Sequence, residues 1–244
     1  MGSMYAPDSP TRDASSAGRV VVVHGLFFVP FQFAVVLKAL RRAGFEPSLV
    51  RYASNRQPAA DSVHEIGAFL DRVRPVAGAE EDGGAPIHFV GYSLGALALR
   101  SALAARPGFP AGRFVMIAPP NHGVGLLSGP LPSVALRCGG PALEDLREDS
   151  DFVRDLPPPP PGSGIIAGDR PATVLHPSWW IRRQIDAADP HDGTVELRNT
   201  RLPGVPHVIV HRSHATICWS PEVAGLVRGF IESGRFPATA AATA

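Results

Sequence analysis

Apolar, β-branched runs alternate with amphipathic patterns along the chain from Arg19 onward. The apolar runs that predict strands are "RVVVVHG", "PSLVRYAS", "PIHFVG", "RFVMIAPP", "SGIIAGD" and "PHVIVHRS". Apolar positions at helical spacing lie between or after them, over residues 31–44, 61–75, 94–107 and 221–233. Because the strand runs are apolar on both faces, the pattern predicts an α/β fold with a mostly parallel sheet flanked by helices.

The limits of the helices carry their own signals. Ser220 is a suitable N-cap residue and Pro221 fits the first helical position that follows it. Gly44 and Gly234 stand where two helices should end, because glycine adopts the left-handed conformation that commonly closes a helix.

Residues 121–162 interrupt the strand and helix alternation. They contain a helical pattern over 141–156 and end in the proline run of "LPPPPPG", and a simple crossover between two strands would be shorter. We expect this insertion to form a small cap over the carboxyl edge of the sheet. The cap would belong to a single domain over 18–235, between disordered tails at 1–17 and 236–244.

The most specific motif is "GYSLG", which places Ser93 between Gly91 and Gly95 directly after a predicted strand and directly before a predicted helix. This is the nucleophile-elbow pattern, in which a strained turn lifts a serine hydroxyl above the sheet and requires small neighbours. The helix N-terminus then faces the serine, so the amide of Leu94 is a candidate oxyanion donor.

A second oxyanion donor is expected from the loop after an earlier strand. "VVVVHGL" offers His24, Gly25 and Leu26 there, and the backbone N–H of Leu26 is the candidate. We interpret His24 as a structural side chain that bonds the loop backbone.

Three histidines near the C-terminus compete for the role of general base. His207 and His211 lie in or at the end of the last predicted strand, where a histidine is more often packed or at an edge. His214 falls on the following loop, from which a side chain can reach over the sheet edge. His214 is therefore the predicted base.

The acid that orients this histidine is less clearly marked. "FVMIAPPN" ends in Asn121, which cannot carry a negative charge, so the search moves to later loops. Asp192 in "DPHDGTVEL" is favoured because Gly193 and the apolar residues after it predict a loop that folds back toward the sheet. Asp169, at the end of a strand, is the second candidate and Asp189 is the third.

With these residues in place, the chain resembles the α/β-hydrolase superfamily, and within it lipase- and esterase-like proteins related to bacterial lipases and GPI-inositol deacylases. The matching pieces span residues 20–233 and are "VVVVHGL", "IHFVGYSLG", "FVMIAPPNHG", "DGTVEL" and "HRSHATI". The resemblance implies Asp192 as the acid and His214 as the base. It implies cleavage of carboxylic esters through an acyl-enzyme on Ser93, without a cofactor.

The resemblance leaves the substrate class open at two places. Tyr92 stands where many lipases have histidine, and Phe27 and Phe28 stand where further small residues are common. We expect these three residues to contact a small apolar ester or acyl substrate. The alternatives are a thioesterase, acyltransferase or cyclase of a biosynthetic pathway, and a non-catalytic binding protein with the same fold.

Composition and charge limit the classes of partner and cofactor that we expect the protein to bind. The net charge is +1 without a basic stripe, which argues against nucleic acid, and the histidines lack HExxH-like spacing, which argues against a metal site. No apolar stretch is long enough for a membrane span, and the first residues lack the apolar middle of a signal peptide, so we expect a cytoplasmic protein unless a native leader directs export. Cys138 and Cys218 are expected to be reduced. The oligomeric state is not predicted.

Overall fold

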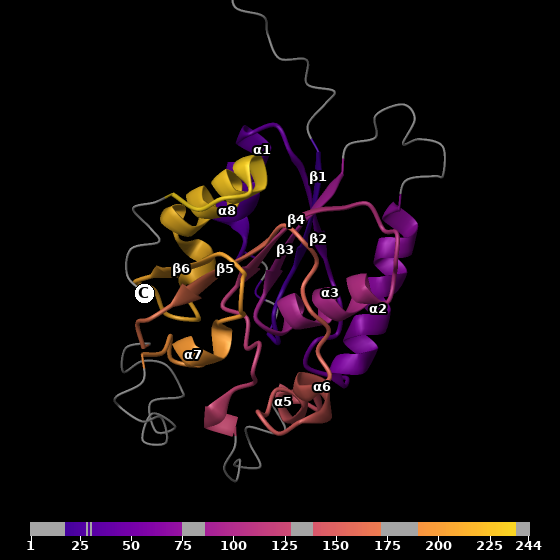
Figure 1. The fold of residues 1–244 in the computed structure, drawn as a ribbon, viewed down its shortest axis with the longest axis vertical. Coiled ribbons are helices and arrows are strands. Elements are labelled where there is room, and N and C mark those ends of the chain that lie inside the picture. The colour runs from indigo at the N-terminus through magenta and orange to yellow at the C-terminus, as the bar shows by residue number, and fades with distance from the viewer. Residues whose placement is uncertain are drawn as a thin grey trace, which may run out of the picture.

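The computed structural model describes residues 18–27, 29, 31–74, 86–127, 139–171 and 190–237. At its centre lies a six-stranded sheet in the order β2-β1-β3-β4-β5-β6, and every neighbouring pair is parallel (Figure 1). The strands are β1 (Arg19–Val23), β2 (Glu46–Val50), β3 (Ile87–Tyr92), β4 (Ala111–Ile117), β5 (Ser163–Gly168) and β6 (His207–Val210). The predicted α/β class is confirmed, and the described sheet is entirely parallel.

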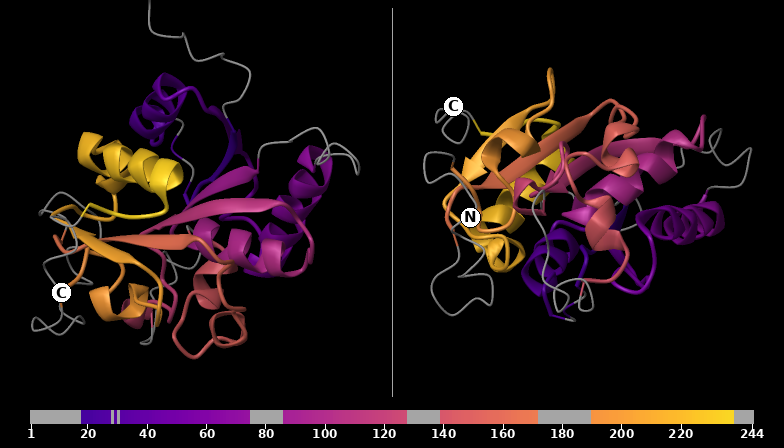
Figure 2. Two further views of the ribbon diagram at one scale, coloured as in Figure 1. Left: turned by 45° about the horizontal axis from the view of Figure 1, so that its top comes forward. Right: turned by 90° about the horizontal axis from the view of Figure 1, so that it is seen from below.

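Helices cover both faces of the sheet (Figure 2). On one face α1 (Ala34–Arg42) packs beside α8 (Pro221–Ser233), and on the other α2 (Ala59–Val73) packs beside α3 (Leu94–Ala104). The buried side chains form a separate apolar cluster on each face, as the unbroken apolar strands predict. In β3, for example, Phe89 packs toward α3 whereas Val90 and Tyr92 pack toward α1 and α8.

The predicted helix ends are confirmed. Ser220 caps α8 and its hydroxyl accepts a hydrogen bond from the amide of Val223, with Pro221 at the first helical position. Gly234 ends the same helix with a φ of 75°, and Gly44, just beyond α1, has a φ of 85°. Helices α1 and α8 therefore both end next to a glycine in the left-handed conformation.

The C-terminal packing extends further than expected. Phe236, placed by the sequence at the start of a disordered tail, instead packs against Phe230 of α8 with ring centroids 4.6 Å apart. The two aromatic rings also cover Gly164, where an added Cβ would lie within 3.0 Å of both.

The insertion at 121–162 contains short elements in its described parts: η2 (Gly125–Leu127), α5 (Ala142–Asp145) and α6 (Asp151–Arg154). The helical pattern over 141–156 thus forms two single turns instead of one helix. Ser150 explains the interruption, because its side chain caps α6 by accepting from the amide of Val153. In Figure 1 both turns lie near one end of α2 and α3.

His207 makes the stability of the fold sensitive to acid. It begins β6, and its Nε2 lies 2.9 Å from the hydroxyl of Thr200, the last residue of the short helix α7 (Leu197–Thr200). Burial, with a smaller contribution from Arg201, lowers the pKa of His207 to about 4. Between that pH and the ordinary histidine value of 6.5, the unfolded chain binds more protons than the folded chain. The free energy of unfolding therefore falls as the pH falls through this window.

Replacing His207 by glutamine is expected to weaken this acid sensitivity. Glutamine keeps a donor for Thr200 but cannot be protonated, so the variant should lose about 1–2 kcal/mol less than wild type between pH 6.5 and 4, a value discounted for the partly exposed ring. Urea unfolding at several pH values measures this difference. Parallel pH profiles for the two proteins would show that His207 does not cause it.

Candidate active site

The carboxyl ends of the strands bring the predicted residues together. Ser93 follows β3, Asp192 lies on the segment between β5 and β6, and His214 follows β6. Nε2 of His214 lies 3.1 Å from Oγ of Ser93, and its Nδ1 lies 2.6 Å from Oδ2 of Asp192. Because an ionised carboxylate only accepts hydrogen bonds, Nδ1 carries the hydrogen and Nε2 presents its lone pair to the serine hydroxyl.

Ser93 occupies a strained turn. Its φ is 51°, a left-handed value that is rare outside glycine, and it precedes the first residue of α3. Its amide donates to the carbonyl of Ile117 on β4 at 2.9 Å, so the neighbouring strand holds the turn. An added Cβ at Gly91 would lie 2.5 Å from Cα of Ala96, and one at Gly95 would lie 2.1 Å from the carbonyl oxygen of His24. Both glycines are required by the close approach of backbone.

Asp192 is held by its own loop. It is only 1% exposed, and its Oδ1 accepts from the amides of Thr194 at 2.9 Å and Val195 at 2.8 Å. Gly193, with a φ of 97°, permits the tight turn that brings these amides round. The second oxygen, Oδ2, is thereby left to face His214.

The other candidate residues have different partners. Oδ1 of Asp169 lies 2.9 Å from Nδ1 of His211. This pair lies at the surface and takes no part in the hydrogen bonds of the His214 side chain. His207 is engaged with Thr200, as described above. Asp189 lies outside the described residues. Of the histidine and aspartate candidates that the structure describes, His214 is the one that hydrogen-bonds to Ser93, and Asp192 is the aspartate that hydrogen-bonds to His214.

The loop after β1 comes directly against the serine. An added Cβ at Gly25 would lie 3.0 Å from Cβ of Ser93, and one at Gly95, in the first turn of α3, would meet the carbonyl oxygen of His24. Leu26, the predicted second oxyanion donor, is buried in this loop. Leu94 is the first residue of α3, where backbone amides have no acceptor within the helix.

Two residues that follow β2 support this loop, and sequence reasoning did not identify them. The Tyr52 hydroxyl donates to the carbonyl of His24 at 2.7 Å, and the Ser54 hydroxyl donates to the carbonyl of Leu26. His24 stacks on Tyr52, its Nδ1 donates to the carbonyl of Gly25 at 2.8 Å, and burial lowers its pKa. These contacts agree with the structural role expected for His24.

The three expected substrate contacts have different outcomes. Phe27 is 51% exposed beside Leu26, as a substrate contact requires. Phe28 lies outside the described residues. The substrate contact of Tyr92 stays a prediction: its side chain is 5% exposed within the apolar cluster, and its hydroxyl donates to the backbone carbonyl of His214 at 2.8 Å. Burial raises the pKa of Tyr92, so this hydroxyl stays a donor.

Within the described residues, no group of three or more histidine, cysteine, aspartate or glutamate side chains is arranged to hold a metal ion. No helix in the same part of the chain has the length and apolarity needed to cross a bilayer. Cys218 is a buried free thiol, and burial raises its pKa, whereas Cys138 lies outside the described residues.

Comparison with known proteins identifies the fold. No family model matches the sequence, and no curated protein matches it. Among solved structures, the mature lipase BlEst2 of Bacillus licheniformis superposes with a TM-score of 0.67 at 17% identity, over 91% of this chain and 94% of that one. A metagenomic carboxyl esterase, MGS0156, gives a TM-score of 0.62 at 18% identity, over 93% of this chain and 77% of that one.

A third similar structure is YbtT, a type II thioesterase from the yersiniabactin biosynthetic pathway. It superposes with a TM-score of 0.57 at 15% identity, over 93% of this chain and 97% of that one. These similarities agree with the parallel sheet and its covering helices. The chain therefore has the α/β-hydrolase fold that its sequence motifs predict.

Proposed function

We propose that this protein is a serine hydrolase that cleaves carboxylic esters through an acyl-enzyme on Ser93. The observation that carries the proposal is the hydrogen-bonded series from Asp192 to His214 at 2.6 Å and from His214 to Ser93 at 3.1 Å. The series lies at the carboxyl ends of a parallel sheet, where open α/β folds bind their ligands. Its three members have the chemistry of a nucleophile, a base and an orienting acid.

In this mechanism Oγ of Ser93 attacks the ester carbonyl carbon while its proton passes to Nε2 of His214. The tetrahedral intermediate places its negative oxygen on the backbone N–H groups of Leu26 and Leu94. Asp192 stabilises the imidazolium, which then protonates the leaving alkoxide as the C–O bond breaks. Water repeats the sequence on the acyl-enzyme, with His214 as base, and releases the acid.

The surroundings of the series favour an apolar acyl or alkyl group. Phe27 presents an exposed aromatic ring next to the loop residue Leu26. Leu26 and Leu94 pack in one apolar cluster with Ala142 and Leu146 from the insertion. The insertion at 121–162 would thus form a cap on a single domain over 18–235. This cap would exclude water from the reacting ester.

The direct test combines a fluorophosphonate probe with a chain-length series of p-nitrophenyl esters. Wild type is expected to be labelled at Ser93 and to hydrolyse at least one ester, whereas Ser93→Ala should be neither labelled nor active, because labelling requires an activated serine. Intact-protein mass spectrometry counts the labelled sites. The chain length that is hydrolysed fastest measures the size of the acyl site.

The same experiment separates the alternatives. If the protein is labelled but hydrolyses no oxygen ester, the favoured reaction becomes thioester cleavage or acyl transfer. A series of acyl-pantetheine substrates then tests that reaction. The similarity in fold to a type II thioesterase motivates that second series. Absence of labelling in folded wild type would contradict the enzymatic proposal and favour a binding protein that has this fold.

A further inference from the structure

The main chain of His214 is fixed at both of its polar groups. Its amide donates to the backbone carbonyl of Asp192 at 2.8 Å, and its carbonyl accepts from the hydroxyl of Tyr92 at 2.8 Å. The side chain makes the further bonds to Asp192 and Ser93. Asp192 thus holds His214 through main chain and side chain, while the serine turn holds it through two consecutive residues, Tyr92 and Ser93.

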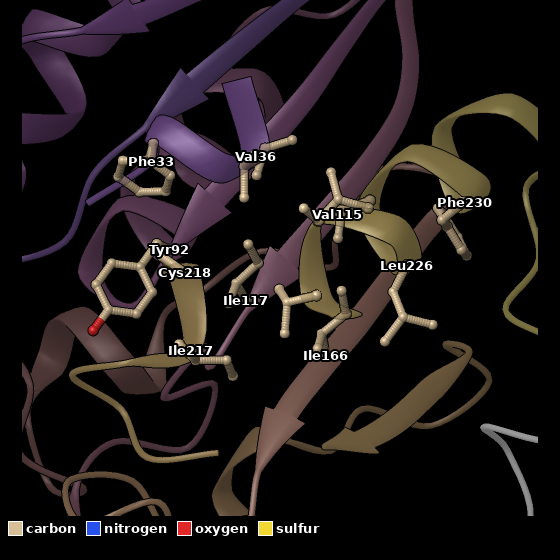
Figure 3. Close-up of a cluster of buried hydrophobic side chains, with 14 of the residues drawn as sticks. Phe33, Val36, Tyr92, Val115, Ile117, Ile166, Ile217, Cys218, Leu226 and Phe230 are labelled. Carbon is tan, nitrogen blue, oxygen red and sulfur yellow. The ribbon is translucent and has the colours of Figure 1, made fainter. Parts of the chain in front are cut away.

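The side chain of Tyr92 has little freedom to move. Its ring packs edge-on against Phe33 with centroids 6.1 Å apart, and Figure 3 shows it among the buried side chains of the cluster formed with α1 and α8. On its other side it lies 5.0 Å from the ring of His214, at an angle of 37°. A ring held in this way places its hydroxyl at a fixed point beneath the His214 loop.

Gln32, in the turn before α1, is a buried polar residue that acts on this hydroxyl. Its side chain is 5% exposed, and its Oε1 is buried with no hydrogen-bond partner among the described residues. Burial raises the pKa of Tyr92, and the side chain of Gln32 partly opposes this rise, as a donor beside the phenol oxygen would. The Tyr92 hydroxyl itself gives its hydrogen to the carbonyl of His214.

We propose that Tyr92 is a positioning residue that sets the place of His214 over Ser93. The inference rests on the proposed function of Ser93 and His214. Tyr92 ends β3 with its ring packed in the core, and Ser93 follows it in a strained conformation, so the distance between the Tyr92 hydroxyl and Oγ of Ser93 should vary little. When the hydroxyl holds His214, the proton acceptor stays at hydrogen-bond distance from the nucleophile. Loss of this hold should slow acylation without altering substrate binding.

The principal test is Tyr92→Phe, which keeps the ring packing and removes the hydroxyl. We expect kcat per titrated active site to fall about 10–100-fold with KM unchanged, and the rate of fluorophosphonate labelling to fall in parallel. The matched control is Ser163→Ala. Ser163 is also buried, and its hydroxyl donates to the carbonyl of Pro160 at 2.6 Å. It is the first residue of β5, at the amino ends of the parallel strands, whereas Ser93 lies at their carboxyl ends. That variant should lose stability and keep the wild-type kcat.

A second variant keeps the inference falsifiable if Tyr92→Phe folds poorly. Gln32→Met removes the buried amide that acts on the Tyr92 hydroxyl but leaves the hydroxyl in place, so kcat should fall by less than in Tyr92→Phe. In the double variant the Gln32 substitution should have no further effect, because its role depends on the hydroxyl. Fully additive effects, or a Tyr92→Phe variant within about twofold of wild type, would overturn the inference.

Failure of the proposed function gives a different result. If wild type does not react with the fluorophosphonate, the position of His214 is followed directly through the exchange of its Nδ1 proton with water by NMR. Tyr92→Phe should speed this exchange and Ser163→Ala should not. Equal exchange in all three proteins would overturn the positioning role of Tyr92, whatever reaction the site performs.

Discussion

Replacing Asp192 by asparagine is expected to lower kcat by about four orders of magnitude while the protein stays folded. Oδ1 accepts from the amides of Thr194 and Val195, and an asparagine would keep its carbonyl oxygen in that place. Its NH₂ group would then face Nδ1 of His214, which must become an acceptor. The hydrogen moves to Nε2, and the ring can no longer accept the proton of Ser93. Ester hydrolysis and circular dichroism of the purified variant measure activity and folding together.

The matched control is Asp169→Asn, which changes the other aspartate that pairs with a histidine. Its partner, His211, lies on the surface and hydrogen-bonds to Asp169 instead of Ser93, so kcat should stay within about twofold of wild type. If Asp169→Asn removes activity and Asp192→Asn does not, the acid is assigned to the wrong loop. Comparable losses in both variants would mean that the two loops act together.

The two aspartates also show where sequence reasoning reaches its limit. Asp169 ends an apolar run, whereas Asp192 precedes a glycine and further apolar residues, so neighbouring residues alone favour Asp192 without deciding the choice. What distinguishes them is which histidine each meets through space: His214 for Asp192 and His211 for Asp169. That pairing depends on how the 190–196 segment and the loop after β6 pack together, and no local pattern encodes it.

Ser93 was easier to identify because its constraints are local. A strand, a strained residue and a helix follow one another within a few positions, and the required glycines flank the serine. The burial of Tyr92 also follows from a local signal. In a strand, residues two apart lie on the same face, and Val90 is buried toward α1 and α8, so the same parity places the Tyr92 ring in that apolar cluster.

The supporting residues Tyr52 and Ser54 could not be found in this way. Each lies in the segment after β2 and acts through a hydrogen bond to the loop that follows β1. Polar residues in such segments are common, and their sequence context does not indicate which backbone group they will reach. The sequence thus predicts the sheet and the nucleophile well. It predicts poorly which hydrogen bonds hold the loops around the site.

Gly95→Ala is expected to destabilise the protein by at least about 3 kcal/mol and to abolish fluorophosphonate labelling. Its Cβ would lie 2.1 Å from the carbonyl oxygen of His24 and 2.8 Å from that of Val23. Both are backbone atoms, and they belong to β1 and the loop that carries Leu26, so α3 and this loop must separate. Separation moves the amides of Leu26 and Leu94 apart, which removes the proposed oxyanion site together with the packing.

Gly225→Ala provides the control for helix propensity, because Gly225 lies in α8 with no atom within 4 Å of an added Cβ. Alanine is favoured over glycine inside a helix, so this variant should gain about 0.5–1 kcal/mol and keep wild-type labelling. Urea unfolding of both variants, with unchanged m-values, measures the opposite signs. If Gly95→Ala is as stable and as readily labelled as Gly225→Ala, the close contact between α3 and the β1 loop does not exist in solution, and the oxyanion site placed there has no support.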